Sequence, residues 1–157
     1  MLTKLEILED KARQNDIRIY NYRLSPSKKA CCVEFGDEYV IALDKYAITS
    51  RAEECVLLAE EIGHIETGGL FVPTSSMNSM LAKLNRSKQE AGAKHWAYNE
   101  CCSVEDIEVA FSKEGMYGSG AAAEYLGVTV DFLENAINYH RSYGVSFYFD
   151  DWGDCAW

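Results

Sequence analysis

Three side chains that can bind a metal ion or move a proton stand close together in one apolar stretch of this sequence. Glu60, Glu61 and His64 lie within residues 55–65, whose other members are mostly apolar. Successive helical residues advance by about 100°, so Glu60 and His64 lie about 40° apart on one face, and Glu61 lies just beyond His64. Carboxylates and an imidazole on a largely buried helix are costly unless they are paired or bind a metal. The segment therefore predicts a metal or acid–base site, and a solvated acidic patch is the alternative interpretation.

A further carboxylate, Glu90, lies in a second segment predicted to be helical, 26 residues after His64. Glu90, Ala93 and Ala97 share one face of this helix. Because two of the three are small, the helix can approach another backbone closely, with the carboxylate projecting into the contact. The alternative is an ordinary helix–helix seam with Glu90 at its solvent edge. His95 lies about 140° around the helix from Glu90, so we do not expect it to join the site.

The elements that must position these residues indicate an α+β fold. A helix over 3–15 is followed by a strand over 17–20 and a hairpin over 30–43, which together predict a short antiparallel sheet. Helical segments are then expected over 50–68, 87–101, from 103 onward, 121–126 and 130–143, with a serine-rich loop over 71–79. We expect one catalytic-sized unit over residues 1–102 and a helical C-terminal extension over 103–157 packed on it.

Composition and charge exclude several classes of protein. Met1 to Asp16 is charged and has no apolar signal-peptide core, and no apolar run approaches the roughly 20 residues that span a membrane. The six cysteines include no CxxC pair, so we expect reduced thiols and a cytoplasmic protein.

The net charge of −10 is concentrated in residues 101–157, which carry −8 and would repel nucleic acid. A DNA-binding helix-turn-helix over 121–143 is a third interpretation, but its second helix carries Asp131 and Glu134 against Arg141 alone. We therefore expect no direct contact with nucleic acid.

Taken together, the two helical segments resemble the motifs of the ImmA/IrrE family of zinc-dependent metallo-endopeptidases. Members of that family carry an HExxH helix, often as LAxELGHxxTG, followed at a similar distance by an ExxAxxWA or ExxAxxFA helix. In this chain, Leu58 to Gly68 reads LAEEIGHIETG and Glu90 to Ala97 reads EAGAKHWA. The resemblance covers nearly the whole chain and is weaker after residue 103.

This resemblance implies a zincin-like minimal metallopeptidase with an N-terminal helix, a short sheet, active-site helices and a helical C-terminal part. It implies that His64 and Glu90 are ligands of Zn²⁺, and that Glu61 is the general base that takes a proton from the attacking water. ImmA-like proteins of phages and mobile elements cleave a repressor of the helix-turn-helix type. A repressor of this kind is therefore the implied protein substrate, and the implied role is hydrolase activity in repressor regulation.

One departure from the family pattern changes the expected chemistry. Glu60 stands where the first histidine of HExxH would be, so a site of Glu60, His64 and Glu90 would leave Zn²⁺ formally neutral. A less positive centre is a weaker Lewis acid, and carboxylate-rich sites suit Mn²⁺ or another divalent metal comparatively well. The alternative function is that of a catalytically impaired relative that acts as a protein-binding regulator. His140 is expected to be a packed or surface residue, with a distant oxyanion-stabilising role left open.

Overall fold

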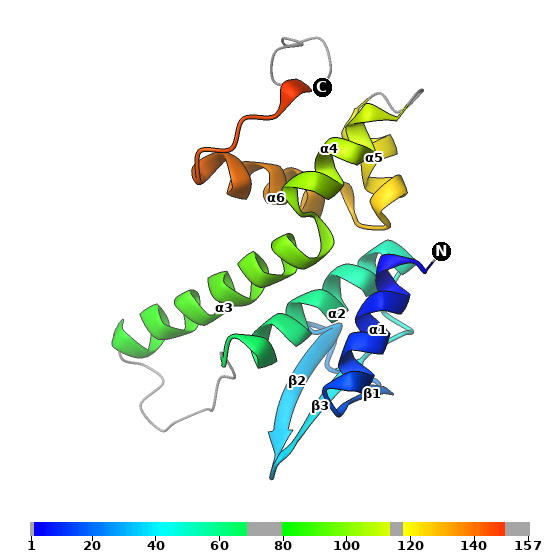
Figure 1. Cartoon of the computed structure of the whole chain (residues 1–157). Helices are drawn as coiled ribbons and strands as arrows, with labels where there is room; N and C mark the ends of the chain where they lie inside the picture. The colour runs from blue at the N-terminus through cyan, green and yellow to red at the C-terminus, as the bar shows by residue number, and fades with distance from the viewer. Residues whose placement is uncertain (1, 69–79, 114–117, 150–157) are drawn as a thin grey trace.

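The computed structural model describes residues 2–68, 80–113 and 118–149, and these form an α+β fold (Figure 1). The described elements, in chain order, are α1 (Lys4–Gln14), β1 (Ile17–Asn21), β2 (Ala30–Phe35), β3 (Glu38–Leu43), α2 (Arg51–Glu66), α3 (Met80–Cys101), α4 (Val104–Ser112), α5 (Ser119–Leu126) and α6 (Val130–Ser142). The predicted order of a helix, a small sheet and then further helices is confirmed. The predicted loop over 71–79 lies outside the described residues, and α3 begins earlier than the expected residue 87.

Hydroxyl side chains cap the first turns of most of the helices. Thr3 forms a capping box with Glu6 at the start of α1, and Ser50, Ser103 and Thr129 accept hydrogen bonds from the third amides of α2, α4 and α6. Each cap satisfies an amide that has no partner within its helix, so it marks where the helix begins.

The sheet is mixed, so the prediction of an antiparallel sheet was wrong in part. Its strand order is β1-β3-β2, with β2 antiparallel to β3 as the hairpin requires, but β1 parallel to β3. Alternating apolar residues predict that a strand exists, but they do not say which neighbour it pairs with. Here residues 22–29 connect β1, at one edge of the sheet, to β2 at the other edge. The hairpin then places β3 between them, beside β1.

The buried carboxylate of Asp44 holds this connection in place. Its two oxygens accept the amides of Leu24, at 3.0 Å, and of Tyr46, at 3.1 Å, so it ties residues after β1 to residues after β3. A carboxylate that accepts backbone amides in this way stabilises a turn without an ionic partner.

Helices α1 and α2 pack side by side on one face of the sheet (Figure 1). Ile17, Ile41 and Leu43 point toward them and are buried, whereas Val33 and Phe35 on the opposite face are 51% and 80% exposed. Leu5, Leu8 and Ala12 of α1 are buried, whereas Leu2, just before the helix, is 57% exposed. Within the described residues, helices therefore cover only one face of the sheet.

Helix α3 packs along α2 and connects the sheet layer with the helices that follow (Figure 1). One hydrophobic cluster runs from Leu8 of α1 through Ala97 of α3 to Leu133 and Ile137 of α6. Among the described helices, none is both long enough and apolar enough to cross a membrane. The long helices α2 and α3 are thus fixed at the centre of the molecule, and both carry residues of the predicted site.

Candidate functional site

Helices α2 and α3 approach each other most closely where Gly63 meets Ala93. A β-carbon added at Gly63 would lie 2.5 Å from the carbonyl oxygen of Ala93 and 3.1 Å from its Cα. Ala93 and Ala97 are fully buried, as the predicted small-residue face of this helix requires. The two backbones can come this close because a glycine faces an alanine. The charged residues of the candidate site lie within one turn of this crossing on either helix.

The crossing brings His64 of α2 and Glu90 of α3 together. The Nε2 atom of His64 lies 3.6 Å from Oε2 of Glu90. The His64 side chain is 15% exposed and the Glu90 side chain is 50% exposed, so the pair lies at the edge of the helix–helix contact and opens to solvent. These two residues, predicted from separate segments to share a site, do lie side by side.

Glu60 and Glu61 lie in the same electrostatic environment. Burial raises the pKa of Glu60; the Lys94 ammonium lowers it, the carboxylates of Glu61 and Glu90 raise it further, and His64 lowers it. The net effect is a pKa above the usual range for a glutamate. Partly buried carboxylates that repel one another hold protons or cations more readily than isolated ones do.

Burial also raises the pKa of Glu61, and its neighbours partly oppose this effect. Polar interactions with the side chain and the backbone of Cys32 lower the pKa, as does the nearby His64. Glu90 raises it, and the net pKa stays above the ordinary value. Glu61 therefore lies near Cys32 of β2.

The donor types present suit a divalent cation. Glu60, His64 and Glu90 offer one imidazole nitrogen and two carboxylates, a set that Zn²⁺ and Mn²⁺ both accept. Within residues 2–68, 80–113 and 118–149, no three His, Cys, Asp or Glu side chains form a group already arranged to hold a metal ion. His64 and Glu90 are thus in place as a pair, while Glu60 interacts with both through its charge and lies one helical turn before His64.

The other two histidines, His95 and His140, pack against neighbouring helices and do not join the candidate site. The ring of His95 packs at a tilt against that of Tyr139 of α6, with 4.5 Å between their centroids. His140 is buried, and its Nε2 lies 2.8 Å from the carbonyl oxygen of Cys102. His140 is therefore a packed residue that joins α6 to the end of α3.

Sequence patterns alone did not identify three neighbours of the site. Cys32 interacts with Glu61, and Lys94 and Tyr98 of α3 interact electrostatically with Glu60. Lys94 and Tyr98 could have been found from sequence, because they follow Glu90 by four and eight residues and so share its side of the helix. Cys32 could not, because its place beside Glu61 depends on how β2 pairs within the sheet.

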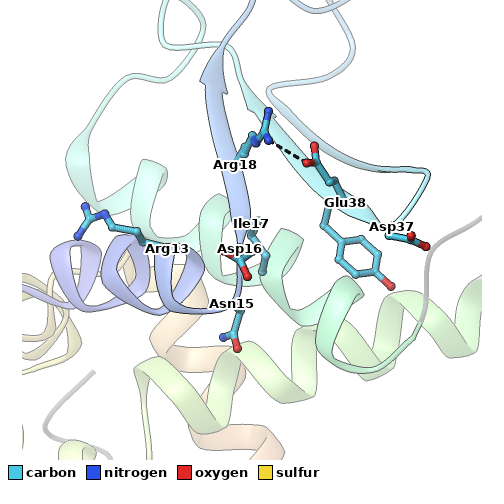
Figure 2. Close-up of a pocket in the computed structure, with 8 residues that line it drawn as sticks. Arg13, Asn15, Asp16, Ile17, Arg18, Asp37 and Glu38 are labelled. Atoms are coloured by element: carbon cyan, nitrogen blue, oxygen red, sulfur yellow. Dashed lines mark hydrogen bonds and ion pairs between the residues drawn. The ribbon is translucent and has the colours of Figure 1, made fainter.

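A hollow of about 560 Å³ lies elsewhere, between the end of α1 and the hairpin (Figure 2). An ion pair between Arg18 and Glu38, 2.8 Å long, spans part of it, and Arg13 and Asp37 lie at its edges. It contains none of the predicted site residues and no nucleophile or imidazole. Its mixed charges give it no evident chemistry, so we place the candidate site at the α2–α3 crossing.

Comparisons with models of protein families, with curated proteins and with solved structures yielded no match for this chain. The case for a function therefore rests on the residues of the crossing and on the motif resemblance.

Proposed function

We propose that this chain is a metal-dependent endopeptidase of the zincin-like ImmA/IrrE type, acting in the cytoplasm with Zn²⁺ as its first-choice metal. The observation that carries the proposal is the close crossing at Gly63 and Ala93, which places His64 3.6 Å from Glu90, with Glu60 and Glu61 on the same helix as His64. Two segments read as motifs of one family thus meet at one point in space. If the two motif matches were accidental, there would be no reason for His64 and Glu90 to lie next to each other.

In the proposed mechanism, Glu60, His64 and Glu90 would hold the cation and Glu61 would move the proton. When bound, a divalent cation supplies a Lewis acid that polarises a peptide carbonyl and makes water more acidic. The Glu61 carboxylate accepts the proton of the attacking water and passes it to the departing amine nitrogen. A pKa raised by burial suits this role, because a base with a higher pKa is a better proton acceptor near neutral pH.

The proposed substrate is a protein, and the motif resemblance points to a helix-turn-helix repressor of a phage or mobile element. This substrate rests on analogy with the family and not on the geometry of the site. The acidic C-terminal helices do not favour direct contact with nucleic acid, so in this proposal the chain acts on the repressor protein and not on its DNA.

A second function is favoured by one feature. Glu60 replaces the histidine expected at the first ligand position, and together with Glu90 it gives the site two carboxylates around one imidazole. A chain that bound its metal too weakly for catalysis could still bind a repressor without cutting it. That regulator is the alternative that the following experiment separates from a peptidase.

The test is the metal content of the protein purified without chelators and after reconstitution with Zn²⁺ or Mn²⁺. We expect about one metal per chain for a mononuclear site. This content should be lost in Glu60→Ala, His64→Ala and Glu90→Ala. Glu66→Ala is the matched control, because Glu66 is an exposed carboxylate on the same helix as Glu60.

Cleavage of a repressor encoded beside this chain is then followed for the wild type and for Glu61→Gln. Loss of cleavage with retained metal in Glu61→Gln supports the assigned roles. A wild type that takes up neither metal after reconstitution refutes the peptidase, and repressor binding without cleavage then supports the regulator.

A further inference from the structure

Two loops at one end of the sheet are tied together by hydrogen bonds. The amide of Tyr22 donates to the carbonyl oxygen of Leu43 at 3.0 Å, so the pairing of β1 with β3 continues one residue past Asn21. The amide of Lys45 donates to the side-chain oxygen of Asn21 at 3.2 Å. The buried carboxylate of Asp44 accepts amides from both loops. The residues that follow β1 and those that follow β3 are therefore joined to each other and to the sheet.

Three tyrosines at this end of the sheet are exposed. Their exposed fractions are 50% for Tyr20, 67% for Tyr22 and 74% for Tyr46. Tyr20 and Tyr22 are two residues apart along the strand direction, so both point to the face of the sheet that α1 and α2 do not cover. Val33, on the same face, is 51% exposed. Single exposed apolar side chains are ordinary, but a group of them on one surface indicates that another molecule binds there.

Arg23 connects the tyrosines of the two loops. It directly follows Tyr22 in the chain, and its guanidinium lies over the ring of Tyr46, 4.6 Å from the ring centroid. A guanidinium stacked on a ring keeps N–H groups at its edge, where they can donate to a second molecule. The stacking also restricts the arginine side chain, so less conformational entropy is lost when it binds.

The charge at this end of the sheet is opposite in sign to that of the whole chain. Residues 20–29 include three basic and no acidic residues, and residues 45–52 include two basic and no acidic residues, whereas the chain carries −10. Lys29 and Lys45 pair with carboxylates of α2 at 2.6 Å and 2.9 Å. Arg23 and Lys28 are exposed, and neither has an ion-pair partner in the part of the chain that the structure describes. These two cations and the three tyrosines form the tyrosine patch, which consists of Tyr20, Tyr22, Arg23, Lys28 and Tyr46.

The groups of the tyrosine patch favour a partner that carries carboxylates. Guanidinium and ammonium groups only donate hydrogen bonds, and tyrosine hydroxyls can donate as well. A carboxylate can accept two parallel bonds from one guanidinium. Tyrosine and arginine are also the residue types that contribute most to binding at protein–protein interfaces. Nucleic acid fits less well, because its binding draws on many cations, and this patch has two on a chain of strongly negative charge.

We propose that the tyrosine patch docks an acidic segment of a partner protein. In this interface, carboxylates of the partner bind Arg23 and Lys28, and its apolar side chains pack on the tyrosine rings and on the uncovered face of the sheet. The patch shares no residue with the α2–α3 crossing, so the inference does not depend on the proposed peptidase activity. It adds to the chain a surface for recruiting a protein.

The test measures fluorescence anisotropy of a short fluorescein-labelled peptide made only of glutamate and leucine. The same peptide with glutamine in place of every glutamate is the charge control. The wild type should bind the glutamate peptide at least about tenfold more tightly than the glutamine peptide, and added salt should reduce this difference because exposed charges are screened. Arg23→Ala and Tyr46→Ala should each weaken binding of the glutamate peptide by about tenfold. Both side chains are exposed, so Tm should change by no more than about 2 °C.

Matched controls come from a second cation–aromatic pair, in the C-terminal helices. The ammonium of Lys113 lies 5.1 Å from the ring centroid of Tyr125. Lys113→Ala and Tyr125→Ala remove the same types of group from a different surface, so both variants should bind the glutamate peptide as the wild type does. Tyr46→Phe keeps the ring under the guanidinium of Arg23 and should retain most of the affinity.

Three results would overturn the proposal. The first is a wild type that binds the two peptides equally, or an Arg23→Ala protein that binds the glutamate peptide as tightly as the wild type. The second is tighter binding of a fluorescein-labelled oligothymidylate of the same length than of the glutamate peptide, which would make the patch a nucleic-acid site. The third is a dimer in sedimentation velocity that Arg23→Ala dissociates, which would make a second copy of this chain the occupant in place of a separate partner.

Discussion

Replacing Gly63 with alanine tests the helix crossing on which the candidate site depends. The new β-carbon would lie 2.5 Å from the Ala93 carbonyl oxygen, whereas an ordinary carbon–oxygen contact is about 3.3 Å or longer. The helices must therefore separate locally by about 0.8 Å, the difference between these two distances. The obstructing atoms belong to the backbone of α3, so no side-chain rotation can relieve the clash.

The expected cost follows from two opposing effects. Overpacking a closely packed contact costs about 1–3 kcal/mol, whereas replacing a helical glycine with alanine gains up to about 1 kcal/mol. We expect Gly63→Ala to lower the free energy of unfolding by about 1–2 kcal/mol, which in a chain of this size lowers Tm by roughly 2–8 °C. Urea unfolding followed by circular dichroism measures the change, and metal content shows whether His64 and Glu90 still meet.

Gly92→Ala is the matched control on the facing helix. A β-carbon at Gly92 would meet only the Thr67 hydroxyl oxygen, at 3.9 Å, which is an ordinary contact. This variant should keep or raise the stability of the wild type, by up to about 1 kcal/mol. A Gly63→Ala protein as stable as Gly92→Ala would show that the two helices do not cross this closely, and the argument for the site would fail with it.

Three further predictions concern stability. Ser50→Ala removes the cap that accepts the Glu53 amide at 3.0 Å, and it should cost about 1 kcal/mol in urea unfolding, an expectation that an unchanged midpoint would contradict. A hydrogen bond from Lys29 is the main cause that lowers the pKa of Glu53 from 4.5 to about 2. Because the folded-state pKa is the lower one, this stabilisation is present above pH 4.5 and is lost as the pH falls toward 2; Glu53→Gln should flatten that part of the pH–stability curve, and a curve with the wild-type slope would refute the assignment. His140→Ala leaves the Cys102 carbonyl without its 2.8 Å partner and should cost about 1–3 kcal/mol or more, with metal content unchanged; loss of metal would instead connect His140 to the site.

Most helices could be predicted from the sequence because their signals are local. Ser50, Ser103 and Thr129 are residue types that favour the N-cap position, and each caps the helix that begins after it. Gly127 takes the left-handed conformation, with φ of 71°, that ends α5. The pairing of β1 could not be predicted in this way. A parallel pairing depends on how a connection crosses the sheet, and nothing in the alternation of residues 17–21 records that.

The contacts of the candidate site also differ in how far the sequence predicts them. The meeting of His64 and Glu90 could be expected from helical periodicity, small residues and motif spacing, since all three can be found in the sequence without knowing how the strands pair. The proximity of Cys32 to Glu61 could not, because it depends on how β2 pairs within the sheet. Helix faces can be predicted residue by residue, whereas the position of a strand requires knowledge of its partner.

The parallel pairing of β1 with β3 also has a consequence for the order in which the sheet assembles. Strands β2 and β3 are joined by a tight hairpin, and hairpins of this kind close within microseconds. Ile17 pairs with Tyr39, 22 residues away, so β1 must wait during synthesis until the whole hairpin has been made. Closing that longer loop costs more chain entropy than closing the hairpin. We therefore expect the hairpin to act as the template, and β1, with α1 behind it, to dock last onto a β3 edge that is already formed.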